Sequence, residues 1–129
     1  MRSFFIGLAC FVPFLASAQT KPLAKGQLVY NNNCLACHQE DGRGVIGLNP
    51  PLSKTKWVLG EKKQLIGIVL KGMKEELEIE GEFYQNVMPA HSHLSDQEIA
   101  DVLTYVRSHF GNTASAVTAL EVKNVRMPK

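Results

Sequence analysis

The chain has 129 residues, 45% of them hydrophobic, and its 14 basic and 12 acidic side chains give a formal charge of +2 at pH 7. This length allows one domain with a modest core. The near balance of charge argues against nucleic acid as a partner, because binding a phosphate backbone normally requires a concentrated basic surface.

The first 18 residues have the pattern of a secretory signal peptide. Arg2 is a short basic start, an apolar run covers 4–16, and Ala16-Ser17-Ala18 is a small-residue cleavage pattern. The run is too short, and too interrupted by Pro13, for a spanning helix, so we expect export to the periplasm without stable membrane insertion. Cys10 lies inside this leader. The expected organisation is a signal peptide at 1–18, a domain at 19–111 and a C-terminal extension at 112–129.

A short helix is predicted at 24–33, ending in an Asn run. Residues 34–38 follow as Cys-Leu-Ala-Cys-His, which is the C-x-x-C-H attachment sequence of a c-type haem. The thiols of Cys34 and Cys37 can each add to one vinyl group of the porphyrin, and the adjacent imidazole of His38 then reaches the iron. The motif predicts one covalently bound haem c with His38 as an axial ligand.

Other uses of these cysteines each need something that the sequence does not supply. A thioredoxin-like redox pair would follow a strand in a βαβ unit, whereas the residues before Cys34 are predicted to be helical. A structural zinc site needs four ligands and would have to recruit a distant histidine such as His91, His93 or His109. A disulfide between Cys34 and Cys37 would close too small a loop to restrain the unfolded chain much.

Two more helices are predicted after the haem motif, beyond a glycine-rich loop at 39–47 and a proline turn at 49–51. The first, at 61–71, ends at Gly72 and has one apolar face, formed by Leu65, Ile66, Val69 and Leu70. The last helix begins at Ser95, which can form a capping box with Glu98, and its apolar face continues to Phe110. Beyond it, the apolar residues of the extension are able to lie over the surface: Leu120, Val122 and Val125.

The stretch 74–83 has a different pattern, because Leu77, Ile79 and Phe83 alternate with glutamates. This alternation predicts a short irregular strand or hairpin arm. Five glutamates lie between Glu75 and Glu82. Such a run is most often a solvated face, but it could also contact a basic patch on a partner protein.

The opposite side of the iron needs a sixth ligand, and Met88 is the best candidate. It precedes Pro89, which keeps this segment out of a helix, and it stands directly before the last helix. A methionine of the core is the alternative interpretation. His91 or His93 could also bind the iron and would give a bis-histidine haem of lower potential. Two other methionines, Met73 and Met127, are interpreted as structural or exposed.

Together, the motif near the start and the Met-Pro before the last helix resemble a class I c-type cytochrome, over nearly all of residues 24–111. The resemblance implies an all-α cytochrome c fold whose helices wrap around one haem. It also implies that Gly26 and Tyr30 of the first helix pack against Tyr105 of the last, beside the cofactor.

The same resemblance implies further cofactor-binding residues. The carbonyl of Pro50, or alternatively of Pro51, would accept the proton of the ligating imidazole, and Leu52 would line the haem. Trp57 would face a propionate or belong to the core. The tail at 117–126 resembles the extension of small cytochromes that accompany bacterial periplasmic oxidoreductases.

These features imply an electron-transfer protein, not an enzyme, which passes one electron from a donor dehydrogenase to an acceptor oxidase or reductase. One alternative is a haem subunit of a dehydrogenase or oxidase complex. The other is a haem gas sensor or peroxidase-like enzyme, which would need a vacant sixth position on the iron. Met88 is the residue that separates the carrier from the sensor or enzyme.

Overall fold

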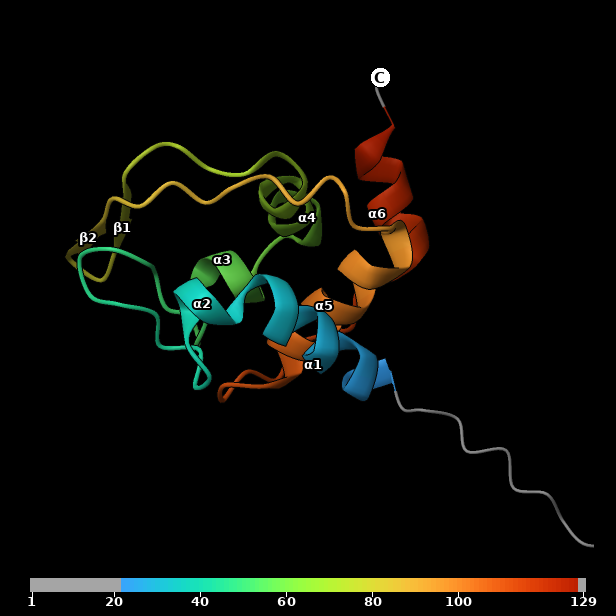
Figure 1. Cartoon of the computed structure of the whole chain (residues 1–129), viewed down its shortest axis with the longest axis horizontal. Coiled ribbons are helices and arrows are strands. Elements are labelled where there is room, and N and C mark those ends of the chain that lie inside the picture. Colours follow the sequence, from blue (N-terminus) through green and yellow to red (C-terminus); the bar gives the residue numbers. More distant parts are fainter. Residues whose placement is uncertain (1–21, 128–129) are drawn as a thin grey trace, which may run out of the picture.

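The computed structural model describes residues 22–127, so the predicted signal peptide and Cys10 lie outside the described part. Within it, the chain is mostly helical with one antiparallel hairpin, which confirms the expected fold class. Figure 1 shows α1 packed along α5, while the hairpin lies at the left edge, away from α6. The elements are α1 (Pro22–Asn33), α2 (Leu35–His38), α3 (Lys56–Leu59), α4 (Lys62–Lys71), β1 (Leu77–Ile79), β2 (Glu82–Tyr84), α5 (Asp96–Ser108) and α6 (Ala119–Arg126).

Helices α1 and α5 pack against each other at Gly26, which has no side chain. A Cβ atom at Gly26 would overlap the backbone carbonyl of Asp101 and lie 2.7 Å from the Cβ atom of Tyr105. One turn further along α1, the completely buried ring of Tyr30 lies 5.6 Å from the ring of Tyr105 and 5.3 Å from that of Phe110. This contact fixes the end of α1, and with it the start of the C-x-x-C-H segment.

Helix α5 begins as its sequence predicts and ends earlier. The Ser95 hydroxyl accepts the backbone N–H of Glu98, and the Glu98 carboxylate accepts the backbone N–H of Ser95, so the capping box is formed. The helix stops at Ser108, although its apolar pattern continues to Phe110. It stops there because the side-chain amide of Asn112 donates to the Val106 carbonyl in place of a helical N–H.

Residues 119–126 form a helix, whereas their sequence predicts only an extension that lies over the surface. Thr118 and Glu121 make a second capping box, and Val122 is completely buried. The guanidinium of Arg126 bonds the Asp96 carboxylate at 2.7 Å and the Leu94 carbonyl at 2.7 Å. Helix α6 therefore packs against α4 and α5 as part of the core, and only Leu120 of its apolar residues lies on the surface.

The predicted strand-like segment is an antiparallel hairpin, with Leu77 opposite Tyr84 and Glu78 opposite Phe83. Glu80 and Gly81 form its turn with positive φ angles of 52° and 85°. Side chains alternate across the two strands, so Leu77 and Tyr84 share one face, while Glu78 and Phe83 share the other. No helix within residues 22–127 is long and apolar enough to span a bilayer.

Candidate cofactor site

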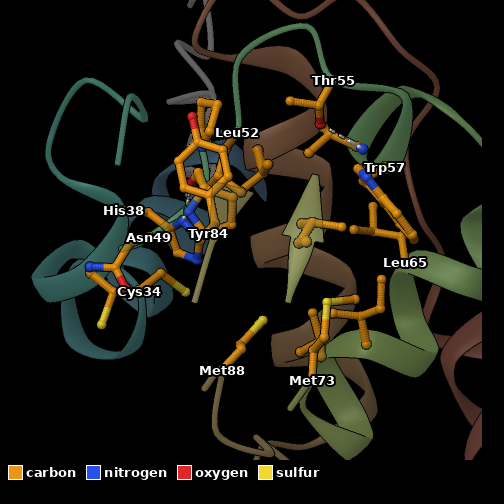
Figure 2. Close-up of a pocket in the computed structure, with 18 of the residues that line it drawn as sticks. Cys34, His38, Asn49, Leu52, Thr55, Trp57, Leu65, Met73, Tyr84 and Met88 are labelled. Atoms are coloured by element: carbon orange, nitrogen blue, oxygen red, sulfur yellow. Dashed lines mark hydrogen bonds between the residues drawn. The ribbon is translucent and has the colours of Figure 1, made fainter. Parts of the chain in front are cut away.

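A pocket opens between the C-x-x-C-H segment on one side and α4, the hairpin and α5 on the other (Figure 2). Its walls are largely apolar and come from segments far apart in the sequence, including Leu52, Leu65, Val69, Leu77, Val102 and Val106. The apolar face predicted for α4 supplies part of this wall, because Leu65 and Val69 lie on it. A pocket with such walls suits a large, flat, apolar group.

His38 lies on the wall of this pocket and is buried. Its Nδ1 atom is 2.9 Å from the carbonyl oxygen of Pro50. Since a carbonyl can only accept, Nδ1 carries the proton and the Nε2 lone pair stays free to bind a metal. Burial lowers the pKa of His38, against the opposing effect of the Pro50 carbonyl, so the imidazole is neutral, which is the form that ligates.

Pro50, and not Pro51, provides the acceptor for His38, and hydrogen bonds of the neighbouring Leu52 hold this loop in place. The N–H of Leu52 donates to the Gly42 carbonyl at 2.7 Å, and the amide of Asn112 donates to the Leu52 carbonyl at 2.9 Å. These bonds tie the loop both to the segment after His38 and to the end of α5. Leu52 itself lines the pocket, as expected.

Cys34 and Cys37 both line the pocket, and both thiols are free. Cys34 is the N-cap residue of α2, and Cys37 lies within this four-residue helix, so the two side chains are held one turn apart beside His38. Burial raises the pKa of the Cys34 thiol to about 11. A redox-active thiol pair has a lowered pKa, so this environment argues against the thioredoxin-like alternative.

Met88 lies across the pocket from the C-x-x-C-H segment (Figure 2). Its backbone is fixed to Met73 by two hydrogen bonds, in which the N–H of each residue donates to the carbonyl of the other at 2.9 and 3.0 Å. Met73 therefore lies next to Met88 and also lines the pocket. The position of Met73 at the end of a helix predicts a structural or exposed residue, because it carries no signal of this pairing.

Trp57 lies in α3 and lines the far wall of the pocket (Figure 2). Its indole Nε1 is buried and has no hydrogen-bond partner within residues 22–127. Because a buried N–H without an acceptor is costly, an acceptor from a bound group would relieve this position. The residue thus suits a cofactor that carries carboxylates.

Tyr105 does not line the pocket, although the resemblance to class I c-type cytochromes implies that it is a cofactor-binding residue. Its ring lies between α1 and α5, stacks on His109 at 4.0 Å and packs against Tyr30. The face of α5 that reaches the pocket carries Val102, Leu103 and Val106 instead. Helical periodicity explains the difference, since residue 105 lies on the side of α5 that α1 covers.

His91 and His93, the alternative ligands, differ in burial. His91 is buried, lines the pocket and donates its backbone N–H to the Val69 carbonyl at 2.8 Å. His93 is exposed and does not line the pocket. Within residues 22–127, no three His, Cys, Asp or Glu side chains gather as a metal site would require, so the zinc alternative gains no support there.

The chain is similar in sequence to several known proteins. The Cytochrome c family model matches residues 23–110. Cytochrome c-552 of Thermus thermophilus is 34% identical over 115 residues, which cover 82% of this chain and 87% of that protein. The cytochrome c subunit of gluconate 2-dehydrogenase from Pantoea cypripedii is 37% identical over 105 residues, 78% of this chain but 24% of that subunit. The cytochrome c subunit of a quinone alcohol dehydrogenase from Gluconobacter oxydans is 33% identical over 103 residues, 78% of this chain and 22% of that subunit.

Proposed function

Because the chain belongs to the cytochrome c family, whose members carry covalently attached haem c, we propose that it is a periplasmic one-electron carrier with His38 and Met88 as axial ligands. Cys34 and Cys37 form the thioethers. The observation that supports these assignments is that all four side chains line one largely apolar pocket. The residues present fit a haem, since His38 offers a free Nε2 atom and Trp57 has an indole N–H that finds no partner among residues 22–127.

When bound, the haem supplies a one-electron couple between ferric and ferrous iron. The protein's own groups set the conditions for that couple. The Pro50 carbonyl fixes the orientation of His38 and raises the basicity of its imidazole. The thioether of Met88 favours the ferrous form and so raises the potential, while the apolar wall limits access of water.

The periplasmic location is supported by the signal-peptide pattern of residues 1–18, because a chain with such a leader is exported. Two of the relatives reported above are subunits of dehydrogenases. A second candidate role is therefore that of a haem subunit within such a complex. The carrier role is favoured because cytochrome c-552 matches this chain over most of its own length, whereas each dehydrogenase subunit is matched over about a quarter of its length or less.

Replacement of the sixth ligand tests the carrier assignment. In the oxidised protein, Met88→Ala should remove the weak near-infrared sulfur-to-iron band and lower the midpoint potential, because a thioether stabilises ferrous iron. Absorption spectroscopy measures the band, and a redox titration measures the midpoint potential. The reduced native protein should bind carbon monoxide slowly or not at all near neutral pH, as a closed sixth position requires.

Met73→Ala is the matched control, because Met73 pairs with Met88 through the backbone and lines the same pocket. It should leave the band in place. If Met73→Ala removes the band and Met88→Ala does not, Met73 is the ligand. Rapid binding of carbon monoxide by the native protein would instead favour the gas-sensor or peroxidase-like function.

A further inference from the structure

Four large apolar side chains are exposed along two segments that flank the pocket. These residues, called the apolar rim below, are Ile46, Leu48, Phe83 and Val87, with exposed fractions of 78%, 47%, 50% and 59%. The two segments adjoin, since Asn86 donates its backbone N–H to the Leu48 carbonyl at 3.1 Å and its side-chain amide to Asn49 at 3.0 Å. Exposed apolar residues that gather in this way indicate a surface for another molecule.

The apolar rim reaches the opening of the pocket at Val87. Val87 and Asn86 line the pocket and are themselves exposed, and the same is true of Cys37. A residue that is both part of the wall and exposed marks where the pocket meets solvent. A partner seated on the rim would therefore lie close to the cofactor edge.

Acidic side chains of the hairpin and of the two residues before it, called the hairpin glutamates below, border the apolar rim at Phe83. Glu75, Glu76, Glu78, Glu80 and Glu82 are all exposed, and Glu78 lies directly opposite Phe83 in the hairpin register. None of them takes part in an ion pair among the described residues 22–127. Their charge is free to act on an approaching molecule.

We propose that the apolar rim and the hairpin glutamates together form the docking surface for a redox partner protein that presents an apolar patch bordered by lysines or arginines. This inference rests on the proposed electron-carrier function and names the chemistry of its partner. The apolar contact supplies the attraction at short range, and the opposite charges steer the encounter.

Other occupants fit this surface less well. In a symmetric dimer of this chain through this surface, both copies would bring the same five carboxylates to one interface, where like charges repel. An anionic membrane surface would repel them in the same way. Electron-transfer complexes bury small interfaces and form transiently, which a rim of four apolar residues matches.

The test uses small redox probes of known charge on the haem-loaded protein. Tris(phenanthroline)cobalt(III) is an apolar trication, and hexacyanoferrate(III) is a polar trianion; each takes one electron from the ferrous protein and leaves it ferric. At low ionic strength, E76Q/E78Q should slow oxidation by the cobalt complex about five-fold and accelerate oxidation by hexacyanoferrate, because two carboxylates no longer attract or repel the probe. Stopped-flow rates across a series of salt concentrations measure this.

The charge-matched control is E40Q/E61Q, which removes two exposed carboxylates outside the hairpin, one just after α2 and one just before α4. It should change both rates less than two-fold. For the apolar rim, Phe83→Ser should slow oxidation of the ferrous protein by the cobalt complex. It should not slow reduction of the ferric protein by hexaammineruthenium(II), which is a polar cation. The control there is Leu120→Ser, which replaces an apolar residue on α6 that is 66% exposed, against 50% for Phe83.

Midpoint potentials of all variants are measured so that rates are compared at equal driving force. Equal effects of E76Q/E78Q and E40Q/E61Q would overturn the docking surface. The docking surface would also be overturned if Phe83→Ser and Leu120→Ser reacted with the cobalt complex at the same rate. If the native protein instead exchanges electrons slowly with every probe, the electron-carrier function itself fails, and the two failures are distinguishable.

Discussion

Several buried polar residues that do not line the pocket hold its walls in position. The amide of Asn112 donates to the carbonyls of Leu52 and Val106, and its oxygen accepts the backbone N–H of Lys54. The guanidinium of Arg107, exposed by only 3%, donates to the Ser115 carbonyl at 2.8 Å and to the Val58 carbonyl. Burial of the Arg107 charge and of the Asn112 amide costs free energy, and this cost is offset because both groups donate hydrogen bonds to backbone carbonyls. Those carbonyls would otherwise be unsatisfied.

Gly26 tests how tightly α1 and α5 are packed. Gly26→Ala should lower the free energy of unfolding by about 2 kcal/mol, because its Cβ would overlap the Asp101 carbonyl and neither helix backbone can move cheaply. Gly67 in α4 is the matched control, since a Cβ there meets no atom within 4 Å. Gly67→Ala should stabilise the protein by about 0.5 kcal/mol through helix propensity. Chemical denaturation measures the free energy of unfolding of both variants. Equal destabilisation would show that the close approach of the helices is not what excludes a side chain at position 26.

Two of the helices, α5 and α6, start with the same capping arrangement. Hydrogen bonds from the hydroxyl and backbone N–H of Ser95 lower the pKa of the Glu98 carboxyl. The backbone N–H of Thr118, followed by the ammonium of Lys62 from α4, lowers the pKa of Glu121. In the second case, the capping carboxylate also links α6 to α4, at a Lys62–Glu121 distance of 3.0 Å.

These lowered pKa values make stability depend on pH in a defined direction. A carboxyl whose pKa is lower in the folded state releases its proton more readily there, so it stabilises the fold above the pKa of the unfolded chain, about 4.3. This contribution is lost as pH falls through the lowered folded value. Glu98→Gln should therefore flatten the fall of stability with acid below about pH 5, and Ser95→Ala should do the same by removing the donor. Thermal unfolding at a series of pH values measures the slopes, and slopes unchanged from the native protein would contradict the role of the capping box.

On the scale of the whole molecule, α6 closes the core on the side away from the hairpin (Figure 1). Val122 is buried against α4 and α5, and Arg126 ties the end of the chain to the segment just before α5. That segment continues back through His91 to Pro89 and Met88. The last helix of the chain thus supports the wall of the pocket that carries Met88.

Truncating Val122 should weaken this support. Val122→Ala should lower the free energy of unfolding by about 2 kcal/mol through lost burial and a residual cavity. Leu120→Ala, two residues away and 66% exposed, should change it by no more than about 0.5 kcal/mol. Denaturant unfolding compares the two. Similar small effects at both positions would mean that α6 adds little to the stability of the fold.

The sequence by itself determined the fold class, the cofactor type and the ends of several helices, because these depend on local patterns. The C-x-x-C-H motif needs only five adjacent residues, and the capping box of Ser95 and Glu98 needs only one turn of helix. The apolar face of α4 could be identified from its 3.6-residue period alone. The same Thr-x-x-Glu signal was present at Thr118, but the mainly polar sequence before it concealed a helix that only packing on α4 and α5 stabilises.

Only the tertiary structure decided which distant side chains meet. Pro50 and not Pro51 accepts from His38 in a loop that is held by two hydrogen bonds of Leu52, one donated to the Gly42 carbonyl and one accepted from the distant Asn112 amide. The placement of Tyr105 against α1 instead of in the pocket depends on which side of α5 is covered. The pairing of Met73 with Met88, and the apolar rim beside the acidic hairpin, arise from contacts between separate segments. Such contacts join residues that are far apart in the sequence and form only when the chain folds. Local periodicity and spacing therefore do not predict them.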